Sequence, residues 1–264
     1  DSRIHGSVNT NGAVSSRMTH AYPNVAQTPS VGKPYGKECR ELFCVPEGRK
    51  LVGVDVSGLE LRMLGHFLHR FDEGAYGYEV VNGDIHTVNM QAAGLPDRAA
   101  SKRFIYGFLY GAGAAKIGEI VGKGPKEGQK LKNKFLDRTP ALAKLIKAVT
   151  QASKRGYLKG LDGRLLHCRS SHSSLNLLLQ GAGALVCKQW AVEMDKALIA
   201  NHLKDKCQVV ANIHDEHQYE CDEDVAELVG ELSVQSIKKA GEHFNLKVEL
   251  DGEAKIGNNW YETH

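Results

Sequence analysis

The stretch Lys50-Leu-Val-Gly-Val-Asp-Val-Ser-Gly-Leu-Glu-Leu-Arg62 joins two different periodic patterns. Its first half is a short apolar run with β-branched residues, which is typical of a buried strand ending near Asp55. From Leu59 to Phe71 the apolar residues recur at helical spacing instead. The sequence therefore predicts a strand followed directly by a helix, with a carboxylate where the strand ends.

A second carboxylate lies at a similar place near the other end of the chain. Residues 207–214 and 216–221 are two strand-like runs, and His214-Asp215 would form the turn between them. Carboxylates that meet at strand ends can share hard cations through their oxygens, and Glu216 could be a third member. Taken singly, each aspartate is equally consistent with an ordinary turn residue.

The rest of the chain alternates helical patterns with turn signals. Asp84 is a plausible N-cap for a helix that follows Gly83, and Pro96 precedes a helix over 97–110. The remaining predictions are extended segments over 1–35, basic helices within 116–155, a hairpin over 158–167 turning at Asp162-Gly163, helices over 174–202 and 224–244, and a last strand over 246–250.

The predicted helix over 97–110 carries Arg98, Lys102, Tyr106 and Tyr110 at spacings of four. Residues four apart lie on one helix face, so two cations and two aromatic rings would line one stripe. Arginine and lysine can bind a polyphosphate, and a tyrosine can stack on a sugar or base. An amphipathic helix with solvated basic residues would show the same pattern.

The composition is that of a globular protein, with 264 residues, 42% hydrophobic and 25% charged residues and a net charge of +3. Residues 122–159 hold eleven Lys or Arg against two acids, whereas residues 215–231 hold eight acids and no Lys or Arg. This asymmetry fits a polyanion on one side and cations on the other, or two solvated surfaces.

Several classes of protein are disfavoured by what the sequence lacks. No glycine-rich phosphate loop and no hydrolase nucleophile elbow occurs. The six cysteines have no metal-finger spacing and are expected to be free thiols. No apolar run reaches membrane-spanning length and no signal peptide is visible, so we expect no membrane and a cytoplasmic location.

The order of these motifs resembles that of family A (Pol I-like) DNA polymerases, and most of all the replicative enzymes of T-odd phages. Asp55-Val-Ser-Gly-Leu-Glu-Leu-Arg62 is similar to the family's first metal-binding motif, D-x-S-x-x-E-L-R. Residues 98–111 match R-x-x-x-K-x-x-x-[FY]-G-x-x-Y-G, and residues 214–216 match H-D-E. Arg17 with residues 19–29 resembles the template and primer segment, and residues 176–183 resemble a helix that reads the minor groove.

The resemblance implies a right-hand polymerase of the α+β class. Its palm, an antiparallel sheet backed by helices, would comprise residues 1–67 and 176–264, and a helical fingers subdomain would comprise residues 68–175. The reaction would transfer dNMP from a dNTP to a primer 3′-hydroxyl and release pyrophosphate, in phage-type DNA replication. Two Mg²⁺ ions, or Mn²⁺ in their place, would be held by Asp55, Asp215 and the Val56 carbonyl, with Glu216 as a further catalytic carboxylate.

The resemblance also implies roles for the nucleotide-binding residues. Arg98 and Lys102 would bind the triphosphate, and Lys102 could protonate the leaving pyrophosphate. His86 would touch the same phosphates, and Tyr106 would stack on the incoming sugar and base. Glu60 would crowd the sugar's 2′ position and exclude ribonucleotides.

Primer–template DNA would contact a further set of residues. Tyr110 would stack near the templating base, and His214 would lie by the primer terminus. Arg17 and Gln180, with Asn176 on the same helix, would face the minor groove, whose acceptors test pair shape without reading sequence.

The family's thumb and its usual 3′–5′ exonuclease motifs do not occur in the sequence. We therefore expect either a fragment or one part of a split polymerase, with those regions supplied in cis or in trans in a phage-infected bacterial host. Two other readings stay open. A single-subunit RNA polymerase shares the palm chemistry, although Glu60 and Glu216 disfavour it. A non-catalytic nucleic-acid-binding descendant would be expected to lack Asp55, Asp215 or Lys102.

Overall fold

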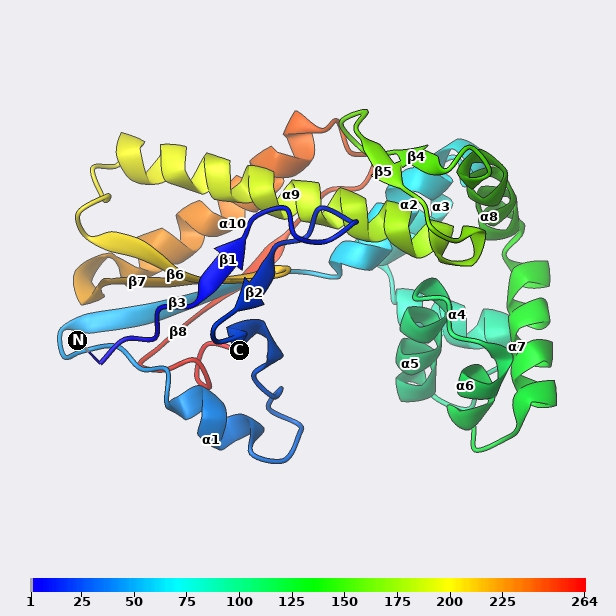
Figure 1. Cartoon of the computed structure of the whole chain (residues 1–264), viewed down its shortest axis with the longest axis horizontal. Coiled ribbons are helices and arrows are strands. Elements are labelled where there is room, and N and C mark those ends of the chain that lie inside the picture. Colours follow the sequence, from blue (N-terminus) through cyan, green and yellow to red (C-terminus); the bar gives the residue numbers. More distant parts are fainter. Residues whose placement is uncertain (1) are drawn as a thin grey trace. The chain divides into compact units, whose positions relative to one another are not determined.

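The computed structural model describes residues 2–264, and the chain divides into two compact units (Figure 1). The sheet unit comprises the residues up to Leu59 together with Gly183–His264, and the helical unit comprises Glu60–Ala182. The predicted divisions, after residues 67 and 175, differ from these by eight and seven residues and fall inside α2, Leu59–Asp72, and at the start of α9, Ser174–Ala200. The palm and fingers assignment of the units stays a prediction.

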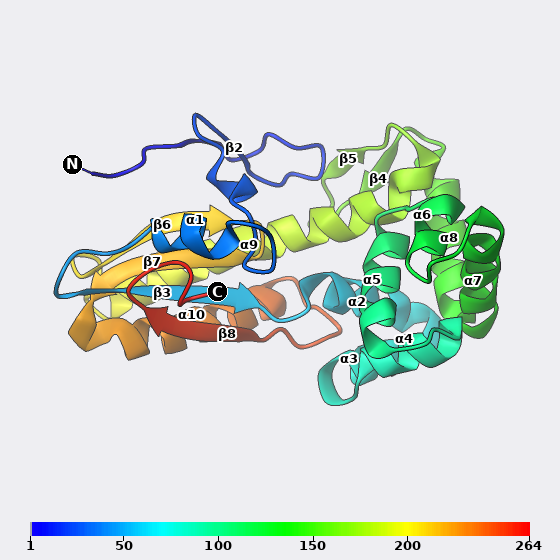
Figure 2. The same cartoon turned by 90° about the horizontal axis from the view of Figure 1, so that it is seen from below.

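The sheet unit is built on four antiparallel strands in the order β6-β7-β3-β8, which Figure 2 shows side by side. Their bounds are Arg49–Val56 for β3, Cys207–Ile213 for β6, Glu216–Asp222 for β7 and Gly252–Gly257 for β8. The predicted strand at Asp55 and the hairpin turning at His214-Asp215 are confirmed, and His214 has a φ of +60°. The α+β fold class is confirmed as well.

The predicted last strand over 246–250 is wrong. That segment is irregular, although Val248 and Leu250 are buried, and the strand that pairs with β3 is β8. Both segments alternate apolar and polar residues, so the pattern alone could not show which of them reaches the free edge of β3.

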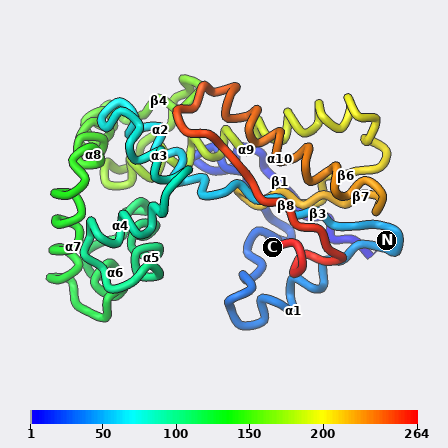
Figure 3. Tube along the Cα trace, turned by 180° about the vertical axis from the view of Figure 1, so that it is seen from behind, coloured from blue at the N-terminus to red at the C-terminus, as the bar shows by residue number. Residues whose placement is uncertain are grey.

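Two long helices cover one face of the sheet: α9, Ser174–Ala200, whose first turns belong to the helical unit, and α10, Ala226–His243. Figure 3 shows α10 running along β3 and β8, and these elements are in contact. The fully buried indole of Trp190 on α9 stacks on His217 of β7 at 3.7 Å and donates to Ser233 Oγ on α10 at 3.1 Å. These contacts bind both helices to the sheet.

The opposite face of the sheet carries the two ends of the chain. Thr263 Oγ1 donates to the Gln218 side chain, and Arg3 forms an ion pair with Glu220 at 2.8 Å. The N-terminal region contains a short ladder of β1, Ser7–Asn9, with β2, Thr19–Ala21, followed by η1, Val25–Gln27, and α1, Gly36–Glu41. Within residues 2–35 the structure shows turns, these two three-residue strands and η1, so the predicted extended segments and turns with little regular helix are confirmed for the described residues.

The helical unit contains one small hairpin and seven helices, if the shared α9 is set aside, within its described residues. In chain order these are α2 Leu59–Asp72, α3 Ala75–Asn82, α4 Ile85–Ala93, α5 Arg98–Leu109, α6 Ala114–Glu119, α7 Pro125–Arg138, α8 Pro140–Ser153, β4 Tyr157–Lys159 and β5 Leu165–His167. Short 3₁₀ turns lie at η2, Ser171–Ser173, here and at η3, Glu223–Val225, in the sheet unit.

Local signals fix several of these helix starts. Asp84 caps α4 as predicted, and prolines occupy the first turn of α7 and α8. Phe104 and Phe108 of α5 pack against Phe135 of α7 and form an aromatic core. Within residues 2–264, no helix has the length and apolar character that crossing a bilayer requires.

Candidate active site

The predicted aspartates lie at the same end of the sheet. In the β3–β7 ladder Asp55 is paired with Glu216, and the Val56 amide donates to the Asp215 carbonyl at 3.0 Å. Asp55 is exposed and Asp215 is half-buried. Two carboxylates that are distant in sequence are thus brought together because β3 and β7 are hydrogen-bonded neighbours.

Glu216 lies in a different environment, since it is only 4% exposed. Its Oε1 accepts from Gln218 at 2.6 Å and from the Trp260 indole at 2.5 Å, and its Oε2 contacts His264 Nδ1 at 2.9 Å. Burial would raise the pKa of Glu216, but the bonds from His264, Gln218 and Trp260 hold that pKa below its ordinary value. Because both oxygens are already engaged, the geometry favours a supporting role for Glu216 over direct metal ligation.

A pocket of about 220 Å³ opens beside these residues. Asp55 and Glu216 line it together with Glu253, Lys255 and His264. Sequence reasoning missed Glu253 and Lys255, which reach the site because β8 pairs Glu253 with Asp55. No group of three or more His, Cys, Asp or Glu side chains in the described residues is arranged as a ready metal site.

The two remaining predicted residues of the sheet unit, Arg17 and His214, do not line this pocket. Arg17 is half-buried just before β2, and its carbonyl accepts from the Ala13 amide at 3.2 Å. His214 is exposed at the tip of the β6–β7 hairpin. The sheet unit therefore holds Asp55, Val56, Asp215, Glu216, His214 and Arg17, while the other predicted residues lie in the helical unit.

In the helical unit the predicted stripe on α5 is formed. Arg98, Lys102 and Tyr110 are exposed, and Tyr106 is half-buried. The Tyr106 and Tyr110 ring centroids are 6.4 Å apart. The opposite face of α5 is buried, so the stripe is the helix's outer face.

Two side chains from neighbouring elements lie beside this stripe, His86 of α4 and Glu60 of α2. The His86 ring lies 6.4 Å from that of Tyr106. Burial, followed by the charges of Arg98 and Lys102, lowers the pKa of His86, although Asp84 opposes the shift. The imidazole is therefore neutral near pH 7 and could donate an N–H to a phosphate oxygen.

Glu60 and Tyr110, which were predicted to contact the sugar and the templating base, are directly connected. The Tyr110 hydroxyl donates to Glu60 Oε1 at 2.9 Å. Asn176 and Gln180, the predicted minor-groove residues, are both half-buried and lie one turn apart on α9. Their spacing places them on one face of the helix.

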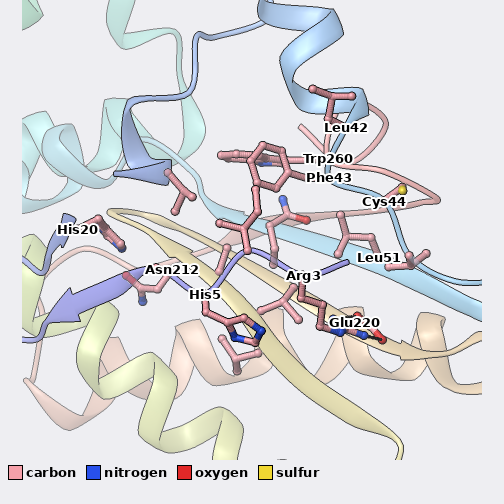
Figure 4. A pocket seen from close by; sticks show the side chains of 18 of the residues that line it. Arg3, His5, His20, Leu42, Phe43, Cys44, Leu51, Asn212, Glu220 and Trp260 are labelled. Atoms are coloured by element: carbon pink, nitrogen blue, oxygen red, sulfur yellow. Dashed lines mark hydrogen bonds and ion pairs between the residues drawn. The ribbon is translucent and has the colours of Figure 1, made fainter. Parts of the chain in front are cut away.

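A larger cavity of about 570 Å³ lies elsewhere in the sheet unit, and Figure 4 shows it from close by. Its walls include Leu51, Phe43 and Trp260, with the Arg3–Glu220 ion pair on one side. None of the residues given individual catalytic or binding roles line it, although His20 and Val25 of the segment over 19–29 do. We therefore take the smaller pocket of the sheet unit and the α5 stripe of the helical unit as two candidate sites, each described within its own unit.

Comparison with known proteins agrees with the resemblance. The model of DNA polymerase family A matches residues 1–262. The chain is 48% identical to the DNA-directed DNA polymerase of Enterobacteria phage T3 and 47% identical to that of Escherichia phage T7, in each case over all of this chain and 42% of the relative. DNA polymerase I of Pseudomonas aeruginosa is 28% identical over 99% of this chain and 30% of that protein.

The fold is also found among solved structures. The POL domain of Pol1 from M. smegmatis, in complex with DNA primer-template and dNTP, has a TM-score of 0.86 and 23% identity over 99% of this chain and 48% of that one. This chain spans about two fifths of the length of its phage relatives. With the family model matched over almost its whole length, the chain belongs to DNA polymerase family A.

Proposed function

We propose that this chain carries the polymerase chemistry of a template-directed DNA polymerase, which transfers dNMP from a dNTP to a primer 3′-hydroxyl and releases pyrophosphate. The observation that carries the proposal is the pairing of β3 with β7, which gathers Asp55 and Asp215 in a chain of family A. The phage T3 and T7 relatives, which are named DNA-directed DNA polymerases, support it.

The donors at the sheet end fit hard divalent cations. Asp55 and Asp215 offer carboxylate oxygens and Val56 offers a carbonyl, and oxygen ligands are those that Mg²⁺ prefers. We propose that these three residues hold two Mg²⁺ ions, which Mn²⁺ could replace. When bound, such a pair of ions stabilises the attacking and leaving oxygens of an in-line displacement.

The α5 stripe fits the nucleotide. Arg98 and Lys102 would neutralise the triphosphate, and Lys102 is the candidate to protonate the departing pyrophosphate. Neutral His86 would donate to the same phosphates, and Tyr106 offers a ring for the sugar and base. Phosphoryl transfer requires mainly positioning and charge neutralisation from the protein, which these side chains supply.

The remaining residues would select the sugar and hold the DNA. The bond from Tyr110 keeps the Glu60 carboxylate in a defined place, which suits a group that excludes a 2′-hydroxyl. Arg17, Asn176 and Gln180 would donate to the minor groove, and His214 would contact the primer terminus. Thumb and exonuclease regions, in cis or in trans, are proposed partners because the relatives are longer than this chain.

A primer-extension assay with Mg²⁺ and dNTPs tests the proposal. We expect extension by the wild-type chain and none by Asp215→Asn, with primer–template affinity nearly unchanged because only one metal-binding charge is lost. Asp195→Asn is the matched control, since it changes an exposed aspartate of α9 that pairs with Lys204. It should extend like the wild type.

Three results would contradict specific parts of the proposal. Loss of DNA affinity in Asp215→Asn would remove the role given to that carboxylate. Preference for ribonucleotides would favour an RNA polymerase. DNA binding without extension, even when thumb-containing protein is added, would favour a non-catalytic binding module.

A further inference from the structure

Asp84 connects the two elements that carry the proposed phosphate-binding side chains. As the N-cap of α4, its Oδ1 accepts from the amides of His86 at 3.2 Å and Thr87 at 3.4 Å, and its Oδ2 accepts from the Thr87 hydroxyl at 2.7 Å. The same carboxylate receives Arg98 Nε from α5, at 3.2 Å to Oδ1 and 3.0 Å to Oδ2. The Asp84 side chain therefore binds both the backbone amide of His86 and the guanidinium of Arg98.

The contact with Asp84 uses only the Nε group of the Arg98 guanidinium. A guanidinium has five N–H donors, one on Nε and four on the two Nη groups. Within the described residues the Asp84 bonds involve Nε alone, and the Arg98 side chain is 60% exposed. These bonds do not use the two Nη groups, which can form a bidentate pair with phosphate.

His86 is held just as firmly. Asp84 binds its amide, and its carbonyl accepts from the fully buried Ser101 hydroxyl at 2.7 Å. Its own Nδ1 is buried without a hydrogen-bond partner in the described part of the chain. The imidazole therefore extends from a backbone that is fixed on both sides.

We propose that Asp84 is a positioning residue for the nucleotide: its carboxylate orients Arg98, and through the helix cap His86, toward the phosphates of the incoming dNTP. The inference rests on the proposed function, which it deepens by adding a residue that touches no substrate itself. The pKa of the Asp84 carboxyl is held far below its usual range, chiefly by the hydrogen bonds from Arg98 and Thr87, so this carboxylate is charged at neutral pH.

Two effects of this charge oppose each other. The carboxylate repels a triphosphate, but it also removes the rotational freedom that Arg98 would otherwise lose on binding. Repulsion is weakened because the charge sits on the first amides of α4, at the positive end of the helix. Orientation keeps its full effect, because an arginine side chain loses considerable rotamer entropy when it is immobilised. We conclude that orientation is the larger effect.

Asp84→Asn separates this role from simple capping. Asparagine caps a helix about as well as aspartate, so α4 keeps its cap while the ion pair with Arg98 is lost. We expect the KM for dNTP to rise roughly 3-fold to 5-fold, the limit for an exposed ion pair, with kcat and Tm little changed. Glu119→Gln, which breaks the exposed Lys116–Glu119 pair at 2.7 Å in the same unit, is the control and should leave KM, kcat and Tm unchanged.

A KM that falls in Asp84→Asn would show that the carboxylate competes with phosphate, and an unchanged KM would show that it only caps the helix. Either result overturns the proposal. In an Arg98→Gln background Asp84→Asn should have almost no further effect on KM, because the group it orients is gone. An undiminished effect there would also refute the inference.

Calorimetric titration with inorganic tripolyphosphate tests the same point without polymerase activity. The wild type should bind more tightly than Asp84→Asn, and Arg98→Gln should bind most weakly. If this order holds but no primer is extended, the proposed function fails while the role of Asp84 stands. If the wild type and Asp84→Asn bind tripolyphosphate equally, the role of Asp84 fails whatever the extension assay shows.

Discussion

Acidification should destabilise the sheet unit through one buried histidine. His217 on β7 is 1% exposed, stacks on Trp190, and contacts the Tyr219 hydroxyl at 3.0 Å and the Asn212 amide at 2.5 Å. Burial lowers the pKa of His217 to about 3, against a small opposing effect of Glu216. As the pH falls, the unfolded chain therefore binds a proton on this imidazole at a much higher pH than the folded chain does.

The magnitude follows from the difference between the two pKa values. An unperturbed histidine titrates near pH 6.5, so the unfolded chain binds the proton from about pH 6.5 downward. Stability is complete above that value and is lost as the pH falls toward 3, by about 1.4 kcal/mol per pH unit. Between pH 7 and pH 5 the free energy of unfolding should fall by about 2 kcal/mol from this group alone.

Urea unfolding at pH 7 and pH 5, in EDTA and followed by tryptophan fluorescence, measures this loss. Trp190 is a direct reporter because its indole lies against the His217 ring. His217→Gln, which cannot titrate, is the comparison: it should be less stable at pH 7 but should lack the additional loss of about 2 kcal/mol at pH 5. Equal losses in the two proteins would show that His217 is not the group responsible, and would refute the reasoning.

Two further predictions concern packing and thiol exposure. In Gly53→Ala the new Cβ would lie 2.3 Å from the Thr263 carbonyl oxygen, so the free energy of unfolding should fall by roughly 1–3 kcal/mol. Gly32→Ala is the control, because its new Cβ would have no atom within 4 Å and should change stability little. If chemical denaturation finds the two variants equally stable, the close packing around Gly53 is contradicted. An aromatic disulfide reagent should modify the exposed Cys44 quickly. It should modify the buried Cys207 only after unfolding, because burial raises the pKa of that thiol to about 12. Labelling of both cysteines at the same rate in the native protein would contradict the burial of Cys207.

Much of the local structure could be predicted because it depends on neighbouring residues. The strand at 49–56, the hairpin turn at His214-Asp215 and the Asp84 cap were readable from apolar periodicity and turn chemistry. The stripe on α5 followed from spacings of four. The last strand was misplaced because two alternating segments compete for one sheet edge, and alternation does not identify the partner.

The sequence by itself thus determined most of the elements and the family, and it named the candidate site residues, whose roles stay predictions. Only the tertiary structure decided that Asp55 and Asp215 lie at the same end of the sheet, that β8 pairs Glu253 with Asp55, and that Glu216 contacts Trp260 and His264. The physical reason is that local spacing sets a helix face or a turn, whereas the environment of a carboxylate depends on strand order and register. Those are fixed by strand pairing and by burying the central strands β3 and β7 between the helices and the terminal segments of the chain.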